Sequence, residues 1–306
     1  MEPLRDGEQL DRYVVEAEIG VGGHARVYRV RHVELGLIRA LKVLLTTDPG
    51  LTSRLLSEGR ALASIRHPNV VEVFDVLRVG EQPALVMEFV GGGALSARIT
   101  GASLDFPEVH RLFRGICAGV GSAHAKGVIH RDIKPDNVIL EGGGGLKLID
   151  LGVARLPHLE ALAAPDIPGT PSYLAPELYA GDPGDERSDI FALGVTLYRA
   201  FAGGAYPYGD VEAFATPQHR RLAPLSQYRP DLPAWLETTL AKSLAPDPAE
   251  RFQDAFELAY ELEKNALSSA PARLRRRPLY ERDPLRFWQV AAIALFLLLL
   301  ASLAAR

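Results

Sequence analysis

The chain has 306 residues, 47% of them hydrophobic, which is ample for packed cores and excludes a disordered protein. A formal net charge of −4 gives no whole-chain electrostatic reason to expect nucleic acid as a partner, since nucleic-acid-binding proteins usually present a strongly basic surface. The single cysteine, Cys117, cannot form an internal disulfide, and its apolar helical surroundings predict a core residue. Residues 1–11 lack the apolar segment of a signal peptide and are expected to form an N-terminal tail.

Residues 12–46 alternate polar and apolar side chains and predict three antiparallel strands joined by two turns. The first turn leads into another strand at Val27–Val30, whereas the glycine-rich turn of a Rossmann fold leads into a helix. Glycines in such a turn let backbone N–H groups approach a phosphate without side chains in the way. The turn formed by Gly20, Val21, Gly22 and Gly23 is therefore a candidate phosphate-binding flap, for which a lone G-x-G pattern is weak evidence by itself.

Lys42 lies among the apolar residues of the third strand, where an unpaired ammonium group would be costly to bury. It therefore needs an anion nearby. Two further strands are predicted within 70–79 and 84–90, and the glycines at 91–93 that follow them are expected to end a first lobe.

A helix is predicted over 106–126, and it delivers the polar stretch HRDIKPDNVIL at His130–Leu140. Apolar flanks and a proline predict a rigid loop rather than a continued helix. Within it, Asp132 could accept a proton from a hydroxyl, Lys134 could neutralise a phosphoryl group, and Asn137 could offer an amide oxygen to a divalent cation. A hairpin turn follows, and Asp150 at the end of the next strand could coordinate Mg²⁺.

These motifs resemble those of protein kinases. The loop matches H-R-D-x-x-x-x-N at all four fixed positions, and the flap matches G-x-G-x-x-G-x-V except that Ala25 replaces the third glycine. The D-F-G motif is met with Leu151 in place of phenylalanine, and A-P-E is met at Ala175–Glu177. The resemblance covers about residues 12–263. Because Lys134 and the GTPSY segment are present, it is closest to serine/threonine kinases, particularly bacterial eukaryotic-like (Hanks-type) kinases with a membrane anchor.

The resemblance implies an α+β, bilobal protein kinase fold. Residues 12–90 would form an N-lobe and hinge with a small antiparallel β-sheet and one main helix, and 91–265 a larger, mostly helical C-lobe. It implies ATP and Mg²⁺ as cofactors, with catalytic roles for Asp132 and Lys134 and metal-binding roles for Asn137 and Asp150. Lys42 and Glu58 would also have catalytic roles, because Lys42 would bind the nucleotide α- and β-phosphates and pair with Glu58, although Glu58 could also be a solvated helix residue. The implied adenine pocket consists of Val27, Ala40, Met87, Glu88, Val90 and Ile139.

The resemblance also implies two buried supports, Arg251 as the partner of Glu177, and Asp189 beneath the catalytic loop. Arg131 would normally pair with a phosphate on the activation loop. However, 153–169 contain no serine, threonine or tyrosine, so the nearest acceptors are Thr170, Ser172 and Tyr173. We therefore expect a fixed carboxylate, Glu160 or Asp166, to take the place of that phosphate.

Phe287–Ala305 is a run of 19 residues without charge, long enough to cross the hydrocarbon core of a bilayer as a helix. The preceding linker, 266–286, is rich in arginine, whereas only Arg306 follows the run. The positive-inside rule therefore predicts a single-pass protein of the inner (cell) membrane with a cytoplasmic kinase domain. The expected partners are this membrane and protein substrates with Ser or Thr hydroxyls, not nucleic acid, and homodimerisation stays open. The alternatives are a membrane-tethered pseudokinase scaffold and a small-molecule phosphotransferase.

Overall fold

The computed structural model describes residues 2–100, 104–150, 171–209, 221–269 and 288. The chain divides into two compact units, Met1–Glu263 and Lys264–Arg306. The first unit carries every described residue of the predicted site, and the description below concerns this unit except for the end of its last helix.

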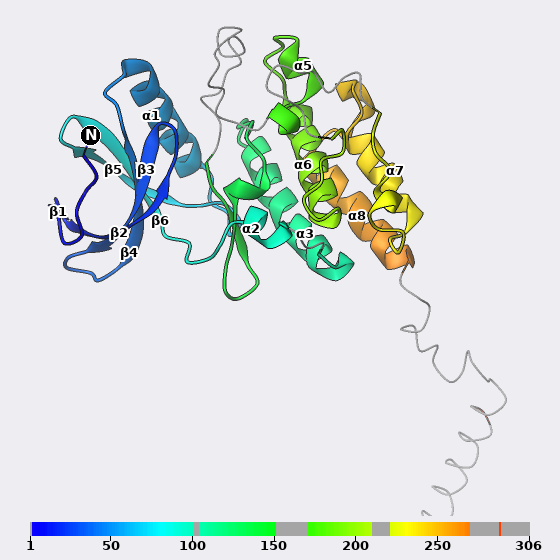
Figure 1. The fold of residues 1–306 in the computed structure, drawn as a ribbon, viewed down its shortest axis with the longest axis horizontal. Coiled ribbons are helices and arrows are strands. Elements are labelled where there is room, and N and C mark those ends of the chain that lie inside the picture. The colour runs from blue at the N-terminus through cyan, green and yellow to red at the C-terminus, as the bar shows by residue number, and fades with distance from the viewer. Residues whose placement is uncertain (1, 101–103, 151–170, 210–220, 270–287, 289–306) are drawn as a thin grey trace, which may run out of the picture. The chain divides into compact units, whose positions relative to one another are not determined.

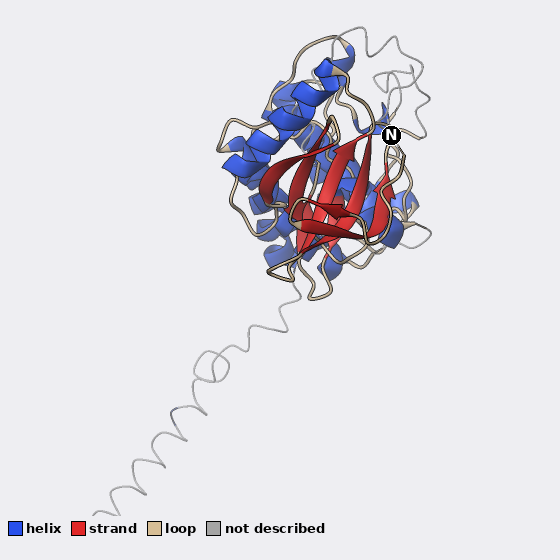
Figure 2. Cartoon of the chain, turned by 90° about the vertical axis from the view of Figure 1, so that its left-hand side faces the viewer, coloured by secondary structure: helices blue, strands red, loops and turns tan. Residues whose placement is uncertain are grey.

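The smaller lobe is built on a six-stranded antiparallel sheet with the strand order β1-β2-β3-β4-β6-β5. Figure 2 looks onto this sheet, with its strands side by side in front of the helices. The three strands predicted over 12–46 and the two predicted after them are confirmed. The strands are β1 (Gln9–Leu10), β2 (Tyr13–Val21), β3 (Ala25–His32), β4 (Ile38–Leu44), β5 (Val73–Val79) and β6 (Gln82–Glu88).

The N-terminal residues belong to this lobe, so the expectation of a tail over 1–11 is wrong. β1 pairs with the start of β2, and Leu4 and Leu10 pack against the apolar cluster that includes Tyr28. The backbone N–H of Leu4 also donates a hydrogen bond to the Tyr28 hydroxyl at 3.2 Å. Two isolated leucines give no periodic signal in the sequence, although both pack against this core.

One helix, α1 (Pro49–Ser64), packs on the sheet, mainly against β6 and β5. Its N-terminus is capped by the Asp48 carboxylate, which accepts a hydrogen bond from the Leu51 N–H at 2.8 Å. On its buried face Gly59 lies so close to Leu85 that an added Cβ would be 2.8 Å from that side chain. Close helix-to-sheet packing therefore explains this glycine.

The larger lobe is mostly helical, and Figure 1 shows its helices beside the sheet lobe. α3 packs against α6, and α6 against α7. Its helices and strands are α2 (Leu95–Ile99), α3 (Phe106–His124), β7 (Val138–Leu140), β8 (Leu146–Leu148), α5 (Pro176–Tyr179), α6 (Glu186–Phe201), α7 (Ala234–Ser243) and α8 (Ala255–Ser269). In the described part of this lobe they are joined by the 3-10 helices η1 (Pro135–Asn137), η3 (Pro171–Tyr173), η5 (Leu225–Gln227) and η6 (Pro248–Glu250).

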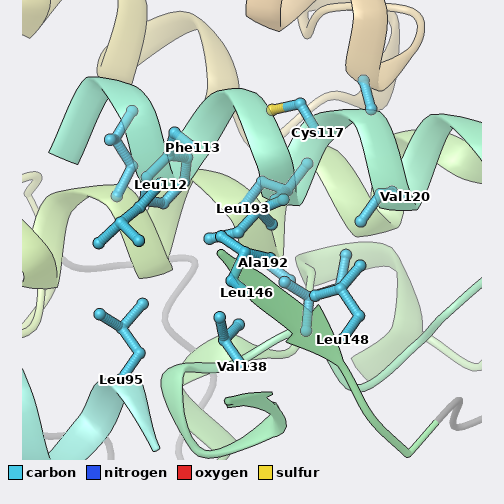
Figure 3. Packing of buried hydrophobic residues seen from close by; sticks show 14 of the residues in the cluster. Leu95, Leu112, Phe113, Cys117, Val120, Val138, Leu146, Leu148, Ala192 and Leu193 are labelled. Carbon is cyan, nitrogen blue, oxygen red and sulfur yellow. The ribbon is translucent and has the colours of Figure 1, made fainter. Parts of the chain in front are cut away.

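The core of this lobe supports the segment that carries the catalytic motif. Figure 3 shows Leu112 and Val120 of α3 close to Leu146 and Leu148 of the β7–β8 hairpin. Cys117 is fully buried in the same core, and this burial raises the pKa of its thiol to about 12. The prediction that Cys117 is a core residue is therefore confirmed.

Gly92, in the segment that connects the two lobes, packs closely against the backbone of Leu140. A Cβ on Gly92 would lie 1.4 Å from the carbonyl oxygen of Leu140, whereas a Cβ on Gly93 would meet nothing within 4 Å. We expect Gly92→Ala to lower the free energy of unfolding by about 1–3 kcal/mol, because backbone must move to admit the methyl group. Gly93→Ala is the matched control. Equal melting temperatures for the two variants would contradict this packing.

Among the described residues, none of the helices is long and apolar enough to cross a bilayer. The predicted span at 287–305 lies outside the described residues except for Trp288. α8 continues to Ser269 rather than ending near Asn265, so residues 266–269 of the predicted linker are helical.

Candidate active site

The catalytic loop is fixed from below by Asp189, a fully buried carboxylate on α6. Its two oxygens accept hydrogen bonds from the backbone N–H groups of His130, at 2.7 Å, and Arg131, at 2.8 Å. Arg131 has a φ of 60°, which is unfavourable for a residue with a Cβ, and these bonds hold it there. The predicted support of the loop by Asp189 is confirmed.

His124, at the end of α3, also contacts Asp189, with its Nε2 2.8 Å from the carboxylate. No motif in the sequence identifies this residue. A histidine at the end of an apolar helix has no special local pattern, and the contact joins residues 65 positions apart. Together, the backbone amides and His124 supply the hydrogen bonds that a fully buried carboxylate needs.

Two polar side chains of the loop, those of Asn137 and Lys134, converge on Asp132. The Asn137 amide nitrogen donates to the Asp132 carboxylate and to its backbone oxygen, each at 2.8 Å. Lys134 Nζ lies 3.1 Å from the Asp132 carboxylate. The 3-10 helix η1, which begins at Pro135, turns the chain back so that Asn137 can reach Asp132. These contacts orient one carboxylate, with a cation beside it.

Lys42 joins the two lobes at the site through two carboxylates. Its Nζ lies 2.8 Å from Glu58 on α1 and 2.6 Å from Asp150, which follows β8. Burial lowers the pKa of Lys42, but Asp150 and Glu58 outweigh it, so its pKa is raised above the ordinary value. Burial likewise opposes ionisation of Asp150, yet Lys42 holds the pKa of that carboxyl below its usual range. The expected ion pair with Glu58 is present, and Lys42 and Asp150 are charged at neutral pH.

A cavity of about 670 Å³ lies beside these groups, within the usual size range of small-molecule sites. The flap over it does not need glycine for its own packing. A Cβ on Gly20 or Gly22 would approach no neighbouring protein atom closer than 3.6 Å, and neither residue has a positive φ. The cavity is lined by Gly20, Val21, Gly22, Ala25, Val27, Lys42, Lys134, Asp136, Asn137, Ile149 and Asp150.

Val27 lines this cavity, whereas the other residues predicted to surround adenine do not. Ala40 and Met87 are buried cross-strand neighbours on β4 and β6. Glu88 pairs with Lys147 at 2.8 Å. Other predicted site residues outside the lining are Gly23, Glu58, Val90, Asp132 and Ile139.

The donor set at the cavity suits Mg²⁺. Among the described residues no cluster of three or more His, Cys, Asp or Glu side chains is arranged to hold a metal. Mg²⁺ does not need such a cluster, since it is usually held by one or two protein carboxylates together with water and substrate phosphates. Asn137 uses its amide nitrogen for Asp132, so its carbonyl oxygen is the atom suited to a cation. Asp150, whose Oδ1 contacts Lys42, supplies the carboxylate.

The segment beyond the cavity is fixed by a buried ion pair. Arg251, which is 1% exposed, donates to both carboxylate oxygens of Glu177, at 2.8 and 2.7 Å. Arg251 also donates to the backbone oxygens of Ala245 and Arg187. The predicted pairing of Glu177 with Arg251 is confirmed, and it holds the A-P-E segment to the helices of the larger lobe.

The carboxylates predicted to pair with Arg131 lie in the activation loop. Glu160, Asp166 and Thr170 lie outside the described residues, whereas Ser172 is buried. The Arg131 side chain donates to the Pro183 backbone oxygen at 3.4 Å.

Comparison with known proteins identifies the class to which this fold and site belong. The model of the protein kinase domain matches residues 13–257, so the chain belongs to the protein kinase family. Within this family, it is similar to bacterial serine/threonine kinases. It is 37% identical to serine/threonine-protein kinase Pkn1 of Myxococcus xanthus, over 80% of this chain and 37% of Pkn1. It is 32% identical to serine/threonine-protein kinase PknL of Mycobacterium tuberculosis, over 86% of this chain and 67% of PknL.

Solved structures agree with this assignment. The crystal structure of the Mycobacterium tuberculosis PknI kinase domain, in a mutant form, is 31% identical, with a TM-score of 0.70. The alignment covers 87% of this chain and 100% of that domain. The predicted bilobal kinase fold is therefore confirmed. The chain spans well under half the length of Pkn1 and of PknB from Mycobacterium leprae, of which it covers 37% and 42%.

Proposed function

We propose that this protein is a membrane-anchored serine/threonine kinase that transfers the γ-phosphoryl group of ATP to protein hydroxyls in signalling. The observation that carries the proposal is the bridge formed by Lys42 between Glu58 and Asp150, beside the glycine flap and the Asp132 cluster. A pseudokinase would be expected to lack one of these charged groups, and none is missing.

Each group has a role that follows from its position. Asp132, held by Asn137, orients the acceptor hydroxyl and accepts its proton. Lys134 neutralises negative charge on the phosphoryl group during transfer. Mg²⁺, when bound by Asn137 and Asp150, supplies further neutralisation of the nucleotide phosphates. Lys42, positioned by Glu58, anchors those phosphates, so the site works by positioning and electrostatics.

A transfer assay tests this function and separates the alternatives. The full chain is incubated with γ-labelled ATP, Mg²⁺ and casein, with EDTA as the control. We expect label on casein that depends on Mg²⁺. A pseudokinase would bind nucleotide without labelling casein, and a small-molecule phosphotransferase would leave casein unlabelled while turning over a small acceptor.

The flap gives a sharper prediction. Gly20→Ala would place a methyl group in the cavity, and we expect it to raise KM for ATP about tenfold, with an unchanged melting temperature. Gly143→Ala is the matched control, because Gly143 lies in the turn between β7 and β8, does not line the cavity, and a Cβ there meets nothing within 4 Å. An equal KM for the two variants would argue against the flap as the phosphate site.

The membrane anchor is part of the proposal, and it rests on the uncharged run at 287–305 and the arginines before it. It places the kinase domain in the cytoplasm. We expect the full chain to remain in the membrane pellet after a carbonate wash and a chain ending at Arg286 to be released. Release of both chains would contradict the anchor.

We also propose that activity does not require a phosphate on the activation loop, since 153–169 carry no acceptor hydroxyl. Mapping of phosphosites on the active enzyme should then find no modification that turnover needs. Stoichiometric phosphorylation of Thr170 or Ser172 that is essential for turnover would contradict this.

A further inference from the structure

Arg199, near the end of α6, is held between two aromatic rings. Its guanidinium lies 4.1 Å from the ring centroid of Tyr206 and 5.5 Å from that of Tyr173. It donates to the Gly204 backbone oxygen at 2.8 Å and to the Tyr173 hydroxyl. These contacts fix the orientation of a half-buried cation.

Arg199 contacts the segment that leads into A-P-E. Tyr173 belongs to η3, two residues before the A-P-E segment that Arg251 fixes through Glu177. Burial, opposed by Arg199, raises the pKa of the Tyr173 phenol, and the charge of Asp136 from η1 adds to this rise. Under the proposed function, the A-P-E segment belongs to the platform for the acceptor peptide, and Arg199 contacts the start of that platform through Tyr173.

Among the described residues, Arg199 has no carboxylate partner, whereas other arginines of this lobe have one. Arg187, Arg229 and Arg251 each form an ion pair with an aspartate or glutamate at 2.8 Å or less. Within the described part of the chain, Arg199 has no carboxylate oxygen within 4 Å. A guanidinium has five N–H donors in a planar fork that suits a carboxylate, and stacking on rings leaves its edge accessible.

We infer that Arg199 binds an acidic side chain of the acceptor protein, so that this kinase prefers a serine or threonine with aspartate or glutamate nearby. The inference rests on the proposed function and adds the substrate class. Arg199 is a specificity residue in this account, because it contacts the substrate away from the transferred group.

The test uses the full chain and synthetic peptides with one acceptor serine. Glutamate, alanine or lysine is placed in turn at each neighbouring position, and kcat/KM is measured for each peptide. For the wild type we expect a glutamate peptide to exceed its alanine counterpart about tenfold, as for one charge-assisted hydrogen bond. In Arg199→Gln this ratio should fall to near one, chiefly through KM, and in Arg199→Glu the lysine peptide should become preferred. Arg98→Gln, at an exposed arginine of α2, is the matched control and should keep the wild-type ratio.

The outcomes are distinct. A wild-type enzyme that phosphorylates peptides without favouring glutamate overturns the inference and leaves the proposed function standing. A glutamate preference that persists in both Arg199 variants also overturns it, as does loss of activity on every peptide in both variants, since Arg199 would then be structural. No transfer to any peptide by the wild type would overturn the proposed function and the inference together.

Discussion

Replacing Asp150 with asparagine is expected to lower turnover by about two to three orders of magnitude and to leave the fold intact. The change removes one of the two carboxylates that line the cavity among the described residues, the other being Asp136. Lys42 keeps Glu58 as its partner, so no buried ammonium is left unpaired. The measurement is kcat with saturating ATP, together with the melting temperature of each protein.

The matched control for this change is Asp231→Asn. Asp231 is exposed, and neither Asp231 nor its partner Arg229 lines the cavity. It should retain wild-type turnover. Equal activity of Asp150→Asn and the wild type would refute the assignment of Asp150, and unfolding of the variant would show that its role is structural.

The second large effect is expected on stability. Arg251→Met should lower the free energy of unfolding by about 3–5 kcal/mol, because it leaves the Glu177 carboxylate without its guanidinium in a buried setting. Arg98→Met, at a surface ion pair with Glu108 at 3.4 Å, should cost less than about 1 kcal/mol. Denaturant unfolding of the two variants measures the difference. Similar losses would mean that the buried pair is no more important than a surface one.

This effect should depend on pH. Burial raises the pKa of Glu177, but hydrogen bonds from Arg251 and Ser188 outweigh it, so the pKa in the folded protein is lowered. The pair therefore stabilises the protein above the pKa of an unfolded glutamate, about 4.3, and this stability is lost as the pH falls through the folded pKa. The gap in melting temperature between wild type and Arg251→Met should be full at neutral pH and narrow below about pH 4. A constant gap would contradict the assignment of the loss to this ion pair.

The sequence was sufficient for the elements whose signal is local. The alternation in 12–46 predicted β2, β3 and β4, and the polar loop between apolar flanks predicted the placement of Asp132, Lys134 and Asn137. Lys42 was recognisable because a cation in an apolar strand requires an anion. The identity of that anion came from resemblance, and the structure adds Asp150 as a second one.

Other features depend on contacts between residues that are distant in the sequence, and no local pattern predicts them. His124 becomes a support of the catalytic loop only when α3 and α6 pack together. Leu4 enters a core through its contact with Tyr28, 24 positions away. Arg199 has no distinctive local pattern in the sequence, and its contacts with Tyr173 and Tyr206 appear only in the folded chain. Periodicity reports which face of an element is apolar, but not which element will cover it.

The most direct test of the central claim is transfer of labelled phosphate from ATP to casein by wild type, Asp132→Asn and Asp182→Asn, followed by analysis of the labelled amino acids. Asp182 is an exposed aspartate outside the cavity and serves as the control. The account predicts phosphoserine and phosphothreonine from wild type and Asp182→Asn, and at least about a hundredfold less from Asp132→Asn. Full labelling by Asp132→Asn, or label on tyrosine alone, would contradict it.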